Sequence, residues 1–343
     1  MDVKFSSHGN VLALSLATGE VKIYTYTEDS MNNVVSFLYH RESWRQVEFS
    51  DDGHFLFTGS ADNTIGIITN GELLHRAKKA HSAPINVVKY IDNNACIATG
   101  DDEGFVKIWD FRICSTKTDE LCVAQFKESE EGITGMDITE DKSKLLTTDS
   151  DGFLTVYDIR ANSDANSDSN MTTMGSAANS SDSFKPSLYA MSDNQEDEQT
   201  GVLIVKNGKK VVTSSQEGVI SLWNWDWFGD WNDRMKGHTS TISTMVKYDE
   251  DTIITGCDDG FVRAVSILPN KVISIINDDM DENEEPMPIS KVAHNKNFWA
   301  IVANDAMVQI YDIQFLKNRF VDQYDSEDED NIKQREKNMA DRK

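Results

Sequence analysis

The fold is decided by the stretch Ala80-His81-Ser82-Ala83-Pro84-Ile85-Asn86 and its continuation Thr99-Gly100-Asp101-Asp102-Glu103-Gly104-Phe105-Val106-Lys107-Ile108-Trp109-Asp110. Apolar and β-branched residues over 85–90, 96–99 and 105–109 predict three short strands, and the polar residues between them predict two turns. A small residue followed by histidine opens the unit, and Trp-Asp closes it. That arrangement is typical of one blade of a β-propeller.

The polar residues of this unit predict a structural clamp made of hydrogen bonds. The inner strands of a blade must be fixed to the turn that joins its middle strands. A histidine, a hydroxyl, a turn acid and a tryptophan are suited to this role, because each of them donates or accepts a hydrogen bond. The candidates are His81, Thr99, Glu103 and Trp109.

The same phrase recurs along the chain, and the recurrence is stronger than any single copy. The turn acids of six copies, which we predict to be structural, are Asp62, Glu103, Asp151, Glu217, Asp259 and Asp305. They lie 41, 48, 66, 42 and 46 residues apart, and a four-stranded blade takes roughly 40–45 residues. With a weaker first copy at 17–24, the sequence predicts an all-β, seven-bladed propeller. His238, in the second full pair of a small residue and histidine, is predicted to hold a clamp position.

The repeat places a single domain over residues 1–324 and a charged, disordered tail over 325–343. The long interval falls in blade four, where Ala161 to Ser183 consists almost entirely of Asn, Ser, Asp, Ala, Thr and Met. Such a segment cannot offset its own ordering entropy, so residues 161–184 are expected to form a mobile insertion. The ring is expected to close through packing between the first and last blades, or through a segment that precedes this sequence.

Composition excludes several classes of function. The formal net charge of −25 rules out a general basic field for nucleic acid, so any contact with RNA is expected to be local or carried by protein partners. The chain has no apolar run of the length that crosses a membrane. The four cysteines show no metal-type spacing, which predicts a reduced, intracellular protein.

No catalytic, metal or cofactor site is predicted. The Asp-rich turns around Asp151 and Asp259 resemble the start of a calcium loop, but a strand follows each of them at once, so they are better interpreted as hairpin turns. Histidines lack zinc spacing, and no nucleophile elbow or phosphate loop is present. We therefore expect neither an enzyme nor a protein that binds a small-molecule substrate.

Partner-binding candidates fall into two groups. Loops at one end of the blades carry Asp101, Asp102 and Asp258, beside the structural Asp259. The second group lies in the aromatic segment 223–231. Trp223 and Trp225 alternate along a strand, which favours packing between blades five and six. For Trp227, Phe228 and Trp231, which lie beyond the strand, interface and packing stay open.

Trp109-Asp110-Phe111-Arg112 and Tyr157-Asp158-Ile159-Arg160 form a tandem Trp/Tyr-Asp-x-Arg pattern. The structural interpretation is a strand end followed by a solvated arginine. In a subset of WD-repeat proteins the same pattern in successive blades binds an adaptor of cullin–RING ubiquitin ligases. Arg112 and Arg160 would then make a substrate receptor of this chain.

A more specific resemblance comes from residues 80–86, 98–104 and 260–270, together with Asn224-Trp225, Phe228-Gly229 and Asp233-Arg234. These residues resemble the family of WD repeat-containing protein 55 and its fungal counterparts over essentially all of residues 3–324. The phrase Arg263-Ala264-Val265-Ser266-Ile267-Leu268-Pro269-Asn270 is far more specific than the generic repeat.

The resemblance implies a non-enzymatic scaffold in the nucleus, chiefly the nucleolus, needed for ribosomal RNA processing and large-subunit assembly. Its expected partners are other proteins, pre-ribosomal assembly factors among them, within whose complexes the chain would act as a monomer. The family's extra residues before the first blade and its lysine-rich C-terminal tail have no counterpart in this sequence.

Overall fold

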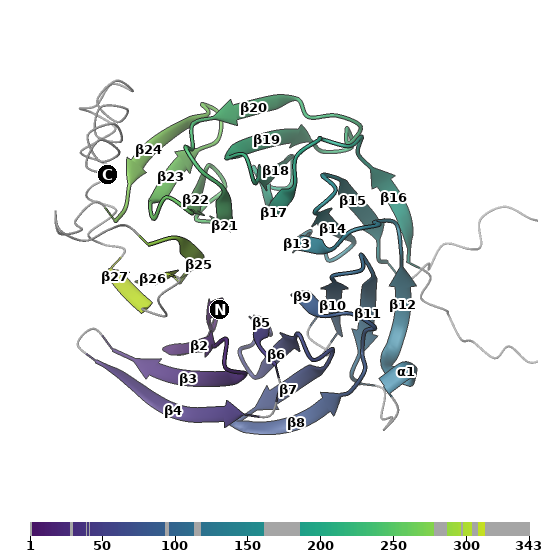
Figure 1. The fold of residues 1–343 in the computed structure, drawn as a ribbon, viewed down its shortest axis with the longest axis vertical. Helices are drawn as coiled ribbons and strands as arrows, with labels where there is room; N and C mark the ends of the chain where they lie inside the picture. The colour runs from purple at the N-terminus through teal and green to yellow at the C-terminus, as the bar shows by residue number, and fades with distance from the viewer. Residues whose placement is uncertain are drawn as a thin grey trace, which may run out of the picture.

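The computed structural model describes residues 2–27, 30–38, 40, 42–92, 96–112, 118–160, 186–277, 287–295, 298–303 and 308–312. Within these ranges the chain forms seven antiparallel sheets arranged radially around a central axis (Figure 1). Six sheets have four strands and one has three. The prediction of an all-β, seven-bladed propeller is therefore confirmed.

Each blade is formed by strands that follow one another in the chain. The first three blades contain β1 (Asp2–Phe5), β2 (Val11–Ser15), β3 (Glu20–Tyr26) and β4 (Met31–Leu38); β5 (Trp44–Phe49), β6 (Phe55–Ser60), β7 (Ile65–Thr69) and β8 (Glu72–Ala77); and β9 (Ile85–Asp92), β10 (Cys96–Asp101), β11 (Val106–Asp110) and β12 (Cys122–Phe126). A single short helix, α1 (Thr118–Leu121), precedes β12 in the described part of the chain.

The remaining blades follow the same order. They contain β13 (Ile133–Ile138), β14 (Lys144–Asp149), β15 (Leu154–Asp158) and β16 (Ser187–Met191); β17 (Gln199–Val205), β18 (Lys210–Ser215), β19 (Val219–Asn224) and β20 (Asp233–Lys236); β21 (Ile242–Lys247), β22 (Thr252–Cys257), β23 (Val262–Ser266) and β24 (Lys271–Ile275); and β25 (Ile289–His294), β26 (Phe298–Ala303) and β27 (Val308–Asp312). The strand β20, which follows the tryptophan segment, has no counterpart in the sequence-based prediction.

The first strand of each blade lines the central axis, and neighbouring inner strands lie beside one another around the ring. Because the strands alternate in direction, the turns between the second and third strands share one face with the connections between blades. We call this the upper face; it carries the turn at Asp102 and Glu103. The lower face carries the other turns, among them the segment from Trp225 to Asn232.

The core lies between the blades. One cluster joins Phe57 and Ile65 of blade two to Ile85, Val88 and Trp109 of blade three, and all five side chains are buried. Burying one such side chain contributes about 1.5–3 kcal/mol, and none of it is gained by a blade without its neighbour. The repeat therefore specifies the ring as a whole.

The recurring Thr-Gly pair is explained by this packing. A Cβ atom added at Gly59, Gly100 or Gly256 would lie 2.7 Å from a methyl carbon on the inner strand of the next blade. At Gly256 it would also lie 2.7 Å from a methyl carbon of Thr244, on the inner strand of the same blade. The side chains that fill the space across the blade boundary are Val88, Ile133 and Ile289. Glycine is needed at these positions because the next blade approaches the backbone.

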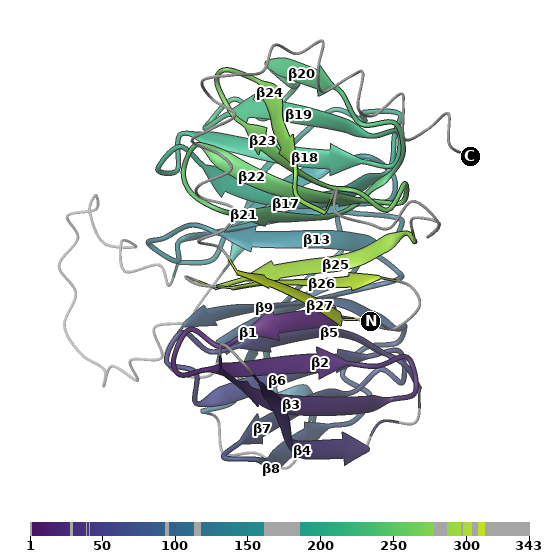
Figure 2. The same cartoon turned by 90° about the vertical axis from the view of Figure 1, so that its left-hand side faces the viewer.

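Blades one and seven meet through side chains. Val3, Phe5 and Tyr26 share a buried cluster with Ala300 and Val302. β1 contacts β25, and the two ends of the ring come together there. Figure 1 shows the N-terminus next to β25, and Figure 2 shows the same region turned by 90°, with β25, β26 and β27 above β1. The insertion at 161–184, the expected outer strand at 320–324, the tail at 325–343 and Asp305 lie outside the described residues.

Candidate functional site

A chain of buried hydrogen bonds crosses blade three. Nδ1 of His81 lies 2.7 Å from Oδ2 of Asp101, and its Nε2 lies 2.6 Å from Oγ1 of Thr99. Nε1 of Trp109 donates to the same Thr99 oxygen at 2.7 Å. Since a carboxylate only accepts hydrogen bonds, the proton of a neutral His81 is on Nδ1, and the Thr99 hydroxyl donates to Nε2.

The acid of this network is Asp101, two residues before the predicted Glu103. Asp101 is the last residue of β10, and its side chain is fully buried. Its carboxylate also accepts the backbone N–H groups of Glu103, at 3.1 Å, and Phe105, at 2.8 Å. Glu103 lies at the exposed tip of the turn, where it accepts from Oγ of Ser82 at 2.9 Å. The prediction that Glu103 is the acid of the clamp is wrong, because Asp101 is the acid that binds His81 and the backbone N–H groups of the turn.

Blade six holds a variant of the same network. Nε2 of His238 lies 2.9 Å from Oγ1 of Thr255. Cys257 occupies the position of Asp101, and Nδ1 of His238 has no hydrogen-bond partner in the described part of the chain. Here the acid is Asp259, which binds the buried Arg263 through two contacts of 2.8 and 3.1 Å. The blade thus keeps a clamp, with an ion pair in place of the buried aspartate.

Blade two contains a clamp residue that the sequence analysis missed. Nδ1 of His40 lies 2.8 Å from Oδ1 of Asp62, and Nη2 of Arg76 donates to Oδ2 of Asp62 at 3.0 Å. His40 precedes Ser60 by the same 20 residues that separate His81 from Asp101. That spacing is the signal that would have found it.

Two further turn acids do not occupy the buried position. Asp151 is half-buried and Glu217 is exposed. In blade four the buried acid is Asp149, whose carboxylate accepts the N–H of Phe153 at 2.8 Å. As in blade three, the residue two positions before the predicted acid is the buried one: Asp149 before Asp151, and Ser215 before Glu217.

The electrostatics of the clamps are those of buried neutral histidines. Burial lowers the pKa of His81, although hydrogen bonding to Asp101 opposes this shift. Burial and the nearby Arg263 lower the pKa of His238 to about 4. Burial raises the pKa of Asp149. These groups lie inside the blades, where the arrangement stabilises the turns.

The acids predicted to bind partners on the upper face fall into two kinds. Asp101 is buried in the clamp, so its prediction as a binding residue is wrong. Asp102 is half-buried, accepts from Nδ2 of Asn86 and lies 3.4 Å from Arg45. Asp258 is exposed and accepts from Oγ of Ser243. Two of the three acids therefore lie at the surface.

The tryptophan segment divides in the same way. Trp227 is 67 % exposed and Trp231 is 38 % exposed, whereas Phe228 is only 3 % exposed. Phe228 packs edge-on against Trp225, with ring centroids 5.4 Å apart, in the cluster between blades four and five. Trp223 is buried in the same cluster, so the prediction that Trp223 and Trp225 pack between blades five and six is wrong. The interface alternative for Phe228 is therefore wrong, because its ring completes the core.

A neighbouring tyrosine extends the exposed aromatic area. Tyr189, on the outer strand β16, is 45 % exposed, and its hydroxyl donates to Oδ1 of Asp226 at 2.7 Å. The ammonium group of Lys144 lies 3.7 Å from the centre of the Tyr189 ring. We call Tyr189, Trp227 and Trp231 the aromatic surface. It lies on the lower side of blades four and five.

The two arginines of the tandem pattern have matching environments. Arg112 donates through Nη2 to Asp110 Oδ2 at 2.5 Å, and Arg160 does the same to Asp158 Oδ2 at 2.6 Å. The side chains are 53 % and 61 % exposed. They follow β11 and β15, so they occupy equivalent positions on the lower face of adjacent blades.

Two general features complete the description. Among the residues that the structure describes, no three His, Cys, Asp or Glu side chains are grouped as a metal ion would require. No helix in the described ranges is long and apolar enough to cross a membrane.

Comparison with known proteins agrees with the propeller fold. A family model described as "WD domain, G-beta repeat" matches residues 32–68, 71–110 and 231–264. The chain is 31 % identical over 317 residues to WD repeat-containing protein 55 of Arabidopsis thaliana, covering 91 % of this chain and 80 % of that protein. It is 33 % identical to the Mus musculus protein of that name, with coverages of 91 % and 73 %. The identity to the Homo sapiens protein is 32 %, with coverages of 92 % and 74 %.

Proposed function

The chain belongs to the family of WD repeat-containing protein 55, and from this premise we propose that it is a scaffold that joins proteins during ribosome biogenesis. It acts in the nucleus, chiefly the nucleolus, where it supports ribosomal RNA processing and large-subunit assembly. Its partners are pre-ribosomal proteins, and its contact with RNA passes through them because its charge of −25 repels a polyanion.

The aromatic surface is the observation that carries the scaffold role. Trp227 exposes two thirds of its side chain to solvent on a framework of packed strands. Exposed tryptophan and tyrosine side chains contribute large contact areas at little entropic cost, and they are enriched among interface hot spots. A rigid ring with such a patch is suited to holding a partner in a fixed position.

The proposed scaffold has no catalytic role. In blade three the buried histidine, hydroxyl and carboxylate groups bind to one another, and we assign them the structural role of holding the turn in place. We assign residues 1–324 to the propeller and residues 325–343 to a separate tail.

The test is affinity purification of the full chain from cells that depend on it. The chain with Trp227→Ala and Trp231→Ala is compared with the natural chain. Leu74→Ala is the matched control, because Leu74 is 61 % exposed on blade two, away from the aromatic surface. We expect pre-ribosomal proteins to co-purify with the natural chain and the control, and to be lost from the double variant. Equal recovery with all three chains would contradict the role of this surface.

A second candidate function rests on Arg112 and Arg160. Their matching exposure and their equivalent places in adjacent blades favour binding of a cullin–RING ligase adaptor. The double variant Arg112→Glu and Arg160→Glu separates the two proposals in the same purification. Loss of a ligase adaptor with retention of pre-ribosomal proteins supports this second role, and absence of any adaptor from the natural chain refutes it.

A further inference from the structure

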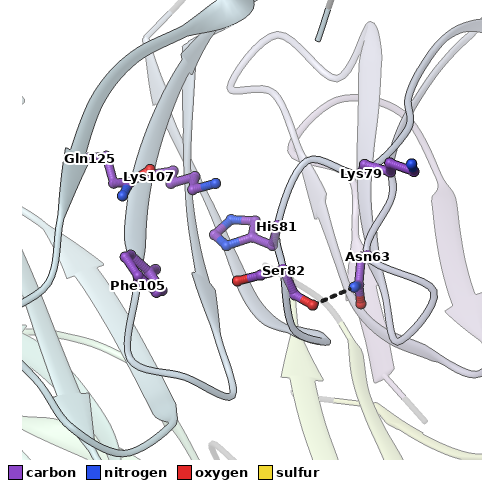
Figure 3. Close-up of a pocket in the computed structure, with 7 residues that line it drawn as sticks. All are labelled: Asn63, Lys79, His81, Ser82, Phe105, Lys107 and Gln125. Atoms are coloured by element: carbon purple, nitrogen blue, oxygen red, sulfur yellow. Dashed lines mark hydrogen bonds between the residues drawn. The ribbon is translucent and has the colours of Figure 1, made fainter. Parts of the chain in front are cut away.

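A cavity of about 570 Å³ opens between blades two and three, apart from the aromatic surface and the two arginines. Its lining consists of Asn63, Lys79, His81, Ser82, Phe105, Lys107 and Gln125. Figure 3 shows Phe105, Lys107 and Gln125 on one side of the cavity, and Asn63 and Lys79 on the other. Two lysines and no acid line it, in a chain whose net charge is −25.

Lys79 and Lys107, the two lysines that line the cavity, form no ion pair with the residues that the structure describes. Lys79 is exposed, and within the described part of the chain its ammonium group forms no ion pair. Lys107 donates one hydrogen bond to the carbonyl of Ala80 at 2.8 Å, which leaves two of its three N–H groups. The ammonium group of Lys127 lies 5.2 Å from the centre of the Phe105 ring, and it donates to the carbonyls of Glu103 and Ser129. Two carboxylates that are not part of the lining bind to lining residues: Asp101 to His81 at 2.7 Å, and Glu103 to Ser82 at 2.9 Å.

The walls of the cavity are held in place by the fold. Nδ2 of Asn63 donates to the carbonyl of Ser82 at 2.9 Å, and the carbonyl of Asn63 accepts from the N–H of Ala80 at 2.9 Å. These two bonds join the turn of blade two to the loop of blade three. On the opposite wall, Lys107 and Gln125 are directly paired across β11 and β12. The backbone that carries the donors is therefore positioned before any ligand arrives, which lowers the entropic cost of binding.

We propose that this cavity binds the phosphate of a phosphorylated serine or threonine in a partner protein. A phosphate carries a charge of about −1.5 to −2 and three acceptor oxygens. Lys79 and Lys107 supply the charge, the exposed amide of Gln125 supplies a neutral donor, and Phe105 offers an apolar contact to the peptide. The inference goes beyond the proposed scaffold role, because it makes one contact of the scaffold dependent on phosphorylation.

A peptide fits the charge distribution better than a nucleic acid does. The field of the whole chain repels a ligand with one charge per nucleotide, whereas a single phosphate on a peptide meets only the local lysines. A glutamate carries about half the charge and fewer acceptor oxygens, so it should bind more weakly. Both alternatives are arms of the test.

The experiment measures fluorescence polarisation with purified full-length chain. The probes are four labelled ligands: nine-residue peptide pools with randomised flanks and a central phosphoserine, serine or glutamate, and a single-stranded RNA of random sequence. The variants are Lys79→Glu and Gln125→Glu, which change exposed side chains. Lys209→Glu is the matched control, because Lys209 is exposed on blade five. The thermal midpoint of each variant is recorded to show that the fold is kept.

We expect the phosphoserine pool to bind, and its dissociation constant to rise about tenfold with either cavity variant and with added salt. The Lys209→Glu chain should stay within about twofold of the natural chain. Equal affinity for the glutamate or serine pool overturns the proposal. So does binding of RNA alone, no binding of any pool, or equal loss with Lys209→Glu. All three variants leave the aromatic surface intact. Capture of pre-ribosomal proteins therefore tests the proposed scaffold role separately from the phosphate site.

Discussion

At the scale of single residues, burial of the side chain decides which acid of a turn is structural. Asp101 is fully buried and contacts His81, whereas Glu103 is exposed two residues later. Removing one partner of a buried polar pair leaves the other without compensation, and this costs more than the pair itself contributes. Asp101 and Glu103 lie only two residues apart, but their replacement should differ sharply in its effect on the free energy of unfolding.

Asp101→Ala is expected to lower the free energy of unfolding by about 2–4 kcal/mol, since it leaves His81 Nδ1 and two turn N–H groups without an acceptor. Glu103→Ala should change it by less than about 0.5 kcal/mol, because its carboxylate is at the surface. Denaturant midpoints with an unchanged slope measure both values. An equal loss for the two variants would return the clamp role to Glu103.

His238 gives a prediction about pH. Its pKa is about 4 in the folded chain and 6.5 in an ordinary environment, so the folded state disfavours the proton. The unfolded chain binds the proton first as the pH falls, and stability is therefore lost between about pH 6.5 and pH 4. The linkage amounts to about 3 kcal/mol at most, at 1.36 kcal/mol per unit.

The measurement compares the natural chain with His238→Gln at pH 7 and pH 4.5. The variant should be less stable at pH 7, and it should lose less stability on acidification than the natural chain does. Because His40 and His81 also have a pKa lowered by burial, part of the acid sensitivity will remain. Parallel pH curves for the two chains would show that His238 does not titrate on unfolding.

At the scale of strands and turns, the sequence predicts an element well where its residue types fit only one local structure. Thr-Gly pairs and polar turns located the second and third strands of blades two, three and six. The outer strand β20 was missed because Asp233–Lys236 is short and follows an aromatic loop without a strand pattern. Exposure within that loop could not be predicted either, since Trp227 and Phe228 are neighbours of similar character.

Gly100 tests the packing between blades. A Cβ atom at this position would lie 2.7 Å from Ile133, so Gly100→Ala should destabilise the chain by about 1–3 kcal/mol through overpacking. Gly229→Ala is the control, because no atom lies within 4 Å of its added Cβ. Thermal unfolding distinguishes them. If both variants melt together with the natural chain, the blades are less tightly packed than the structure indicates.

At the scale of the whole molecule, the repeat period predicts the architecture, but it does not predict the surfaces that we propose to bind partners. Core residues recur because every blade solves the same packing problem. The aromatic surface occurs once, and Tyr189 joins it only because β16 lies beside the loop that contains Asp226. The cavity at Lys79 likewise arises between two blades, from residues that no repeat pattern places together.

The most direct measurement of the proposed function is the level of ribosomal RNA precursors after the protein is depleted. The account predicts that unprocessed precursors of the large subunit accumulate. Re-expression of the natural chain or of Leu74→Ala should restore processing, and the chain with Trp227→Ala and Trp231→Ala should not. Unchanged precursor levels after full depletion, or full rescue by the double variant, would contradict the account.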